Sequence, residues 1–213
     1  MADPIVAPQT PAPVVLTVDA GDDVVTQAGW NVREQVLYPY INGSVGQLMR
    51  YQGQDAVRAN AGAAAANPAV KMLMGVSHGT SGTYVGYGPD PLYAVGNYNP
   101  AEVAGKVVHW TACETAAQLG PDMIANGAAA FLGYTADILF PPELAFMLFD
   151  CDAEIDIALL GGATAGEAYQ RSVSRYNDFI AECDNQGKGY LAQWLAANRD
   201  LLVNLGDAGA QIR

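Results

Sequence analysis

Residues 70–79 (VKMLMGVSHG) and residues 106–113 (KVVHWTAC) decide the fold predicted from this sequence of 213 residues. Each stretch contains an almost unbroken apolar run of strand length, and a third run follows at residues 128–134. Near-continuous rather than alternating apolar runs are typical of strands that are covered on both faces, as in parallel sheets. Helical sequence between the second and third runs would supply a crossover connection. The pattern predicts an α/β fold with a mostly parallel sheet flanked by helices.

The rest of the chain supplies a first strand and the helices that would cover the sheet. Residues 14–18 form a short apolar run before a turn sequence, which predicts that strand. Because composition does not shift sharply along the chain, residues 14–213 are predicted to form one domain after a flexible lead at residues 1–13. Apolar residues at helical spacing, bounded by Pro or Gly, predict helical segments at residues 26–51, before 67, and at 142–160, 164–183 and 189–205.

Two reactive side chains follow the apolar runs directly. The first run ends in Ser77-His78-Gly79, and the second ends in Ala112-Cys113. In open parallel sheets, loops and helix N-termini meet at the carboxyl ends of the strands, where catalytic groups gather. If the two strands are neighbours, both side chains stand on one rim. We therefore predict Cys113 as a nucleophile and His78 as its proton-transfer partner.

The sequence after Cys113 indicates how its sulfur could be activated. Residues 114–119 read as the start of a helix, where free backbone N–H groups and the helix dipole favour thiolate over thiol. A neutral His78 within hydrogen-bond reach would take the thiol proton and later return it to a leaving amine. The backbone N–H groups of Gly79 and Cys113 are candidates for an oxyanion hole, since a glycine lets the backbone approach a substrate closely.

The order of these blocks resembles that of the caspase, legumain, gingipain and clostripain group of cysteine peptidases. The resemblance covers roughly residues 70–175 and is carried by His78-Gly79 and Ala112-Cys113, each after an apolar strand. The continuation, which includes LGPDMIANGA and AFLGY, is similar to gingipain-type domains in particular. The resemblance implies a caspase-like three-layer sandwich. It also implies a cysteine endopeptidase that uses a Cys/His dyad and a thioester intermediate.

Substrate contacts are predicted from the segments around these two residues. The Gly- and Tyr-rich loop at residues 80–98 could line a cleft, with Tyr84 as a candidate contact. In the resembling peptidases, the ends of the first strand and of the strand after the nucleophile help to build the pocket for the residue before the cut. Those positions are near Asp19 and Asp137, and Glu114 beside the nucleophile is a further candidate. Two carboxylates would favour cleavage after Arg or Lys, although either aspartate could instead cap a turn or helix.

Two other functions compete for the same residues. The first is a catalytically silent caspase-like module that binds or assembles with partners. The small size and the lack of a visible activation segment favour it, whereas the presence of both His78 and Cys113 opposes it. The sequence GVSHG also matches the G-x-S-x-G elbow of serine α/β-hydrolases, with Ser77 as nucleophile. That alternative is weakened because no helical period follows at residues 80–88 and no histidine follows His109.

Charge and hydropathy exclude several classes of partner. Lys and Arg total 10 against 22 Asp and Glu, a formal net charge of −12 that would repel nucleic acid and anionic lipid. No stretch reaches the ~18 uninterrupted apolar residues of a membrane span. No basic and then apolar leader is visible, so a cytoplasmic location is the default. The expected partner is a peptide or protein substrate, and oligomerisation stays open.

The remaining cysteines and the second histidine are predicted to be structural. The three cysteines are too few and too widely spaced for a disulfide framework, and no C-x-x-C pair indicates zinc, so no metal or cofactor is predicted. Cys151 and Cys183 have acidic neighbours that raise a thiol pKa, although a disulfide between them stays open. His109 lies roughly 13 Å along a strand from Cys113, which predicts a satisfied sheet histidine rather than a catalytic base.

Overall fold

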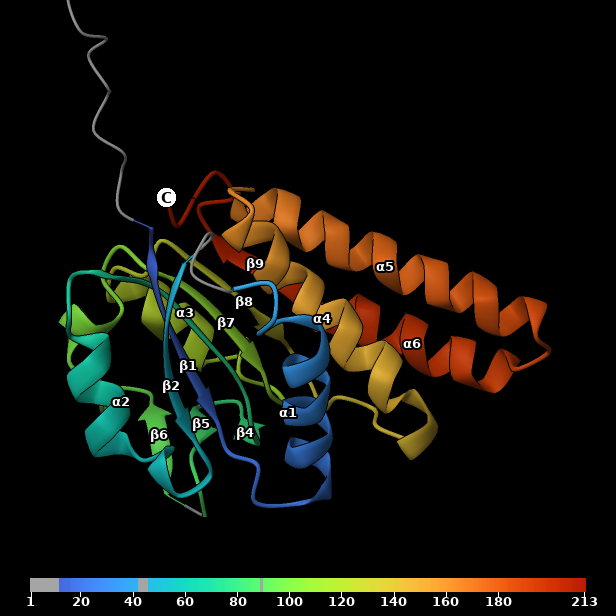
Figure 1. Ribbon diagram of the computed structural model, residues 1–213, viewed down its shortest axis with the longest axis horizontal. Helices are drawn as coiled ribbons and strands as arrows, with labels where there is room; N and C mark the ends of the chain where they lie inside the picture. Colours follow the sequence, from blue (N-terminus) through green and yellow to red (C-terminus); the bar gives the residue numbers. More distant parts are fainter. Residues whose placement is uncertain (1–11, 42–45, 89) are drawn as a thin grey trace, which may run out of the picture.

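The structure, a computed structural model that describes residues 12–41, 46–88 and 90–213, is built around a six-stranded sheet (Figure 1). The strand order is β2-β1-β3-β7-β8-β9; neighbouring strands are parallel except for β9, which is antiparallel to β8. The strands are β1 Val14–Asp19, β2 Gln47–Gln52, β3 Val70–Val76, β7 Val107–Thr111, β8 Ala130–Tyr134 and β9 Leu202–Gly206. The four apolar runs therefore form the four inner strands, and the predicted α/β class is confirmed. Residues 1–11 of the predicted lead lie outside the described residues.

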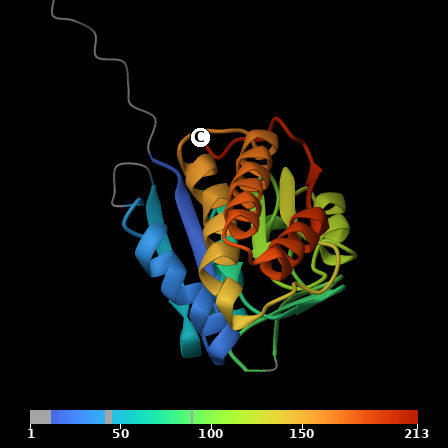
Figure 2. The same ribbon diagram turned by 90° about the vertical axis from the view of Figure 1, so that its right-hand side faces the viewer.

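Helices cover both faces of this sheet, because its inner strands send apolar side chains in both directions. On β3, Met72 and Met74 join one apolar cluster, whereas Leu73 between them joins a second cluster on the opposite face. Helices α1, α4, α5 and α6 contribute to the first cluster, and α2 and α3 contribute to the second (Figures 1 and 2). The helices are α1 Val24–Val36, α2 Arg58–Ala65, α3 Leu119–Ala125, α4 Ala145–Leu160, α5 Ala165–Asn185 and α6 Gly189–Leu201. The result is the predicted three-layer sandwich.

Three segments differ from the sequence prediction. The helix expected over residues 26–51 ends at Val36, and its last part is the edge strand β2. The helix expected over residues 189–205 ends at Leu201, after which the chain forms the other edge strand, β9. The loop at residues 80–98 contains a small antiparallel sheet of β4 Gly79–Thr80, β5 Thr83–Val85 and β6 Pro91–Ala94. Short 3-10 turns complete the chain: η1 Gly53–Asp55, η2 Pro100–Glu102 and η3 Pro142–Leu144.

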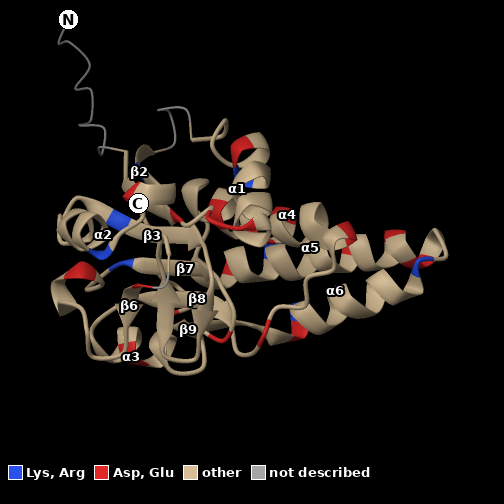
Figure 3. Ribbon diagram, turned by 90° about the horizontal axis from the view of Figure 1, so that it is seen from below, with Lys and Arg blue, Asp and Glu red and all other residues tan. Residues whose placement is uncertain are grey.

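Acidic residues occur in most of the described helices but in only one strand, β1. Figure 3 shows Asp and Glu recurring along α4 and α5, with few Lys and Arg among them. Such a distribution gives the surface a negative field without a basic stripe of the kind that binds phosphate backbones. Within the described residues, no helix is both long enough and apolar enough to span a bilayer.

A buried chain of charges fixes α1 and α4 to the sheet. Arg33 of α1 is almost fully buried and contacts Asp19 at the end of β1, with 3.4 Å between Nε and Oδ1. Its Nη1 donates to Oδ2 of Asp156 on α4 at 2.8 Å. The other oxygen of Asp156 lies 2.7 Å from Nδ1 of His109 on β7. Nε2 of the ring lies 3.8 Å from Asp152 and has no hydrogen-bond partner among the described residues, so the predicted sheet histidine is satisfied at one nitrogen only. Buried charges cost free energy unless they are paired, so these contacts stabilise one position of each helix.

The buried imidazole should make stability depend on pH. Burial by itself would lower the pKa of His109, but Asp156 and Asp152 raise it to about 9. Because this value lies above the ordinary 6.5, the stabilisation is complete below about pH 6.5 and is lost as the pH rises toward about 9. We expect the free energy of unfolding, measured by urea titration, to fall over this range in the native protein and to fall less in His109→Gln.

The His109→Gln substitution should also cost about 3 kcal/mol at the acidic end of the range, because it removes one partner of a buried ion pair. The control is Tyr190→Gln on α6, at a side chain that is 57% exposed and takes no part in the buried charges. This control should retain the pH dependence of the native protein. The same fall in His109→Gln as in the native protein would contradict the prediction.

Candidate active site

The pairing of β3 with β7 brings the two predicted catalytic residues to one edge of the sheet. The strands are adjacent and parallel, with Val76 opposite Thr111. The ladder continues one residue further, where the N–H of Ser77 donates to the carbonyl of Thr111 at 3.2 Å. His78 and Cys113 each lie two residues beyond the last registered pair. The expectation that these strands are neighbours is thus confirmed.

The backbone after His78 packs directly on the backbone at Cys113. A Cβ at Gly79 would lie 2.6 Å from the carbonyl oxygen of Cys113 and 3.0 Å from Cβ of Ala112. Real Cβ atoms do not approach other atoms this closely, so only glycine permits this contact. The glycine after the histidine therefore has a role in packing. Its proposed use as an oxyanion donor stays a prediction.

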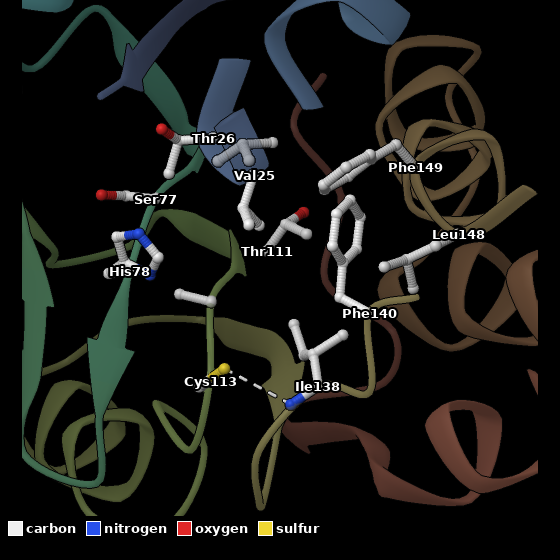
Figure 4. A pocket seen from close by; sticks show the side chains of 12 residues that line it. Val25, Thr26, Ser77, His78, Thr111, Cys113, Ile138, Phe140, Leu148 and Phe149 are labelled. Carbon is white, nitrogen blue, oxygen red and sulfur yellow. Dashed lines mark hydrogen bonds between the residues drawn. The ribbon is translucent and has the colours of Figure 1, made fainter. Parts of the chain in front are cut away.

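A cavity of about 190 Å³ lies at this edge, and both His78 and Cys113 line it. Figure 4 shows these two side chains on one side of the cavity, across from Phe140, Leu148 and Phe149. The remaining lining side chains are Val25, Thr26, Val76, Ser77, Thr111, Ala112 and Ile138. Pockets that hold whole drug-sized ligands are usually larger, so the volume suits a single side chain.

Helix α1 forms one wall of this cavity through Val25 and Thr26, and it packs very close to the sheet. A Cβ at Gly29 would come within 2.5 Å of Cγ1 of Val76 and 2.9 Å of Cε1 of Phe149. Both of these side chains line the cavity. The close approach of α1 therefore depends on a residue without a side chain.

An aspartate that the sequence reasoning missed holds the histidine. Asp23 pairs with Nε2 of His78 and is also the N-cap of α1, where its Oδ1 accepts from the N–H groups of Val25 and Thr26, each at 2.9 Å. Partial burial would raise the pKa of Asp23, but the bonds from Thr26 and His78 outweigh this and lower it to about 2. The only sequence signal was the Asp23-x-x-Thr26 capping pattern, which indicates a helix start and not a histidine partner.

This contact determines which ring nitrogen can act as a base. An ionised carboxylate only accepts hydrogen bonds, so Nε2 of a neutral His78 carries the proton that faces Asp23. The lone pair of the neutral ring is then on Nδ1. Among the described residues no hydrogen bond joins His78 to Cys113, so proton transfer would require the ring and the sulfur to approach each other within the cavity.

Cys113 does not lie at a helix N-terminus, which corrects the sequence prediction. Residues 113–118 form turns, and α3 begins only at Leu119. Burial raises the pKa of the Cys113 thiol, and the nearby carboxylates of Asp137 and Glu114 raise it further. The N–H of Ile138 donates to the sulfur at 3.3 Å, which acts in the opposite direction. The resting sulfur is therefore a protonated thiol at neutral pH rather than a thiolate activated by a helix.

Glu114 holds the turn that follows Cys113. Its φ of +58° lies in the left-handed region, which costs a non-glycine residue about 1 kcal/mol or more. Its carboxylate accepts from the N–H of Ser81 at 3.0 Å, and its own N–H donates to the carbonyl of Ala136 at 3.1 Å. The turn is thus held between two loops. These contacts assign Glu114 a positioning role, and direct contact with a substrate is untested.

The predicted substrate contacts separate into buried and exposed residues. Asp19 is fully buried; beyond its contact with Arg33, it accepts from Tyr38 and from the N–H of Val76, so it cannot reach a substrate. Tyr84 is also fully buried, and its hydroxyl donates to the carbonyl of Val18 at 2.8 Å. Asp137 is exposed beside the sulfur, but neither it nor Asp19 lines the cavity. Asp19 and Asp137 therefore do not form a substrate pocket together.

The remaining candidate nucleophiles are held in other contacts. The hydroxyl of Ser77 donates to the carbonyl of Val85 at 2.6 Å, and β4 follows instead of the helix that a nucleophile elbow requires. Cys151 and Cys183 are free and buried, so the alternative of a disulfide between them is wrong. Burial raises the pKa of both thiols. Within the described residues, no group of three or more His, Cys, Asp or Glu side chains is arranged to hold a metal ion.

Comparison with solved structures identifies the architecture. The chain superposes on the Arg-specific cysteine proteinase gingipain R with a TM-score of 0.65 over 94% of its own length, at 11% sequence identity. The fold is gingipain-like. The chain spans about half of the gingipain R chain, 47% of its length. No protein-family model and no curated protein matches the sequence.

Neutralising the carboxylate beside the sulfur should increase its reactivity. Asp137 raises the pKa of the Cys113 thiol, so Asp137→Asn should lower that pKa and increase the thiolate fraction at neutral pH. We expect alkylation of Cys113 by iodoacetamide to be at least about twofold faster, because more of the thiol is ionised, as measured by mass spectrometry of the labelled peptide. The control is Asp207→Asn, which follows β9 at the amino ends of the parallel strands, away from Cys113. An unchanged rate in Asp137→Asn would show that its charge does not reach the sulfur.

Proposed function

We propose that this gingipain-like chain is a cysteine peptidase, with Cys113 as nucleophile and His78 as proton-transfer partner. The observation that supports this best is the convergence of the two side chains, 35 positions apart in the sequence, on a single cavity. A nucleophile and a base at one concave site, with a third group orienting the base, is the arrangement used in acyl transfer. The likeness to gingipain R supports the same class of reaction, since that protein is a cysteine proteinase.

In the proposed reaction His78 takes up and returns one proton in each of two half-reactions. Nδ1 takes the proton of the Cys113 thiol as the sulfur attacks the carbonyl carbon of a peptide bond. The imidazolium that forms is stabilised by the ionised carboxylate of Asp23. His78 then returns the proton to the leaving amine as the C–N bond breaks, which leaves a thioester on the sulfur. Water, deprotonated by the same imidazole, attacks the thioester carbon; as the C–S bond breaks, His78 returns that proton to the sulfur, which releases the acid product and restores the thiol.

A protonated resting thiol is compatible with this sequence of steps. The thiolate need form only when His78 approaches the sulfur with a substrate in the cavity, because excluding water strengthens electrostatic interactions there. In the proposal, the N–H groups of Cys113 and Gly79 then stabilise the negative oxygen of the tetrahedral intermediate. Asp23, as the N-cap of α1, holds the imidazole in the required tautomer throughout.

The raised pKa of the Cys113 thiol is the observation that favours the second candidate, a gingipain-like module without catalytic activity. Such a module would keep the fold and bind partners without forming a covalent intermediate. The two candidates differ in the reactivity of Cys113 relative to ordinary buried thiols. The cysteines at positions 151 and 183 provide that internal reference.

Covalent labelling distinguishes the two candidates. We expect a peptidyl acyloxymethyl ketone to label Cys113 faster than Cys151 and Cys183, with the adduct located by mass spectrometry. Labelling should be lost in Cys113→Ala and reduced by at least about tenfold in His78→Ala, because the base is missing. Ser77→Ala should retain most of the labelling rate. Labelling of Cys113 no faster than of the two buried cysteines would favour the silent module.

The role of Asp23 can be tested apart from its role as a helix cap. Asp23→Asn retains a good N-cap but removes the charge that stabilises the imidazolium, so we expect a fall in kcat of about tenfold to a hundredfold. Asp23→Ser also retains the cap, but its short side chain cannot hold the ring, and the loss should be similar. Thermal unfolding of both variants should stay close to that of the native protein. Unchanged kcat in both variants would show that Asp23 only caps the helix.

A further inference from the structure

The cavity beside Cys113 has a chemical character that bears on the substrate. Its side chains come from α1, from the ends of β3 and β7, from the segment after β8 and from α4, and most of them are aliphatic or aromatic. Apart from His78 and Cys113, none of the lining residues is ionisable. Figure 4 shows the apolar groups facing the space next to the sulfur. A substrate side chain entering this space would therefore meet mainly carbon atoms.

The few polar groups of the lining are mostly engaged elsewhere. The hydroxyl of Ser77 donates to the backbone of Val85, and the hydroxyl of Thr26 lies 3.0 Å from Oδ1 of Asp23. Thr111 is the exception, because its buried hydroxyl has no hydrogen-bond partner among the described residues. One neutral hydroxyl can accept or donate a hydrogen bond, but it cannot neutralise a charged group.

The carboxylates near the site are either already paired with another side chain or lie outside the cavity. Asp23 is paired with His78, and Asp19 is buried against Arg33. Asp137 is exposed and does not line the cavity. A guanidinium or ammonium entering the cavity would lose its hydration without gaining a partner, which is strongly unfavourable. A substrate carboxylate would also lose its hydration without gaining a partner, because Arg33 is buried and already paired with Asp19 and Asp156.

We infer that this cavity receives the side chain of the residue before the cleaved bond and selects a large apolar one, such as Leu, Met or Phe. The inference rests on the proposed peptidase function, because it places the scissile carbonyl at Cys113. Burial of apolar surface against Phe140, Leu148 and Phe149 supplies the binding free energy. The expected selectivity differs from the Arg specificity named for gingipain R and from the basic preference predicted from Asp19 and Asp137.

A panel of inhibitors tests this selectivity directly. Peptidyl acyloxymethyl ketones that differ only in Leu, Phe, Arg, Lys or Asp next to the reactive group are compared by their second-order rates of Cys113 modification. We expect the Leu and Phe reagents to react at least about tenfold faster than the Arg, Lys and Asp reagents. A preference for a charged reagent would overturn the inference while leaving the peptidase proposal intact. Absence of selective modification by any reagent would overturn both.

A charge placed in the cavity should reverse the preference. Val25 lines the cavity in the first turn of α1, where an added carboxylate is favourable for the helix. In Val25→Asp we expect the ratio of Arg to Leu reagent rates to rise by at least about tenfold. The control is Val24→Asp, at a neighbouring residue that is 83% exposed and does not line the cavity. Equal ratios in the two variants would show that substrate side chains bind elsewhere.

Discussion

The parallel pairing of β3 with β7 is the constraint on which the site depends. Side chains alternate between the faces of a strand, so a shift of one residue in this pairing would move the histidine loop relative to the cysteine loop. The register is fixed because both strands are buried on both faces, by helices on one side and by α2, α3 and the small sheet on the other. The position of the reactive groups thus follows from the packing of the core.

The second constraint is the buried chain of charges between α1 and the sheet. Arg33 connects α1 to β1 and α4, and Asp19 accepts from the N–H of Val76 at the end of β3. The same helix begins at Asp23, which holds His78. The imidazole is therefore oriented by a helix whose own position is fixed by Arg33, nearly three turns further along. A defect in the buried charges would therefore reach the site through α1 and also through Val76 at the end of β3.

The inner strands and the two reactive residues could be predicted because their signals are local. Continuous apolar runs that end in His78 and Cys113 require no knowledge of distant contacts. The edge strands β2 and β9 could not be predicted in this way, because they are partly exposed and their apolar spacing continues that of the helices before them. Only pairing with β1 and β8 determines their conformation.

The environment of the site was harder to predict than its residues. Asp19 is buried whereas Asp137 is exposed. The burial of Asp19 depends on where its partner Arg33 packs, which the local sequence does not indicate. The backbone of Glu114 is left-handed, and α3 begins only at Leu119. Glutamate is not a residue type that indicates this conformation. The partner of His78 lies 55 residues earlier in the chain. Such contacts arise from the assembled fold and have no sequence pattern of their own.

Because Gly29 lets α1 pack closely against the sheet, the width of the cavity and the orientation of the imidazole both depend on the position of this helix. A single methyl group at this position would push the helix outward, since Val76 and Phe149 already occupy the space. The cavity would widen, and the carboxylate that begins the helix would move away from the ring it orients. In this architecture a bulkier group in the cavity cannot be accommodated by retreat of the helix without moving Asp23 away from His78. Changes in what the cavity accepts are therefore expected in the side chains that face α1 across it, because substitutions there leave the distance between Asp23 and His78 unchanged.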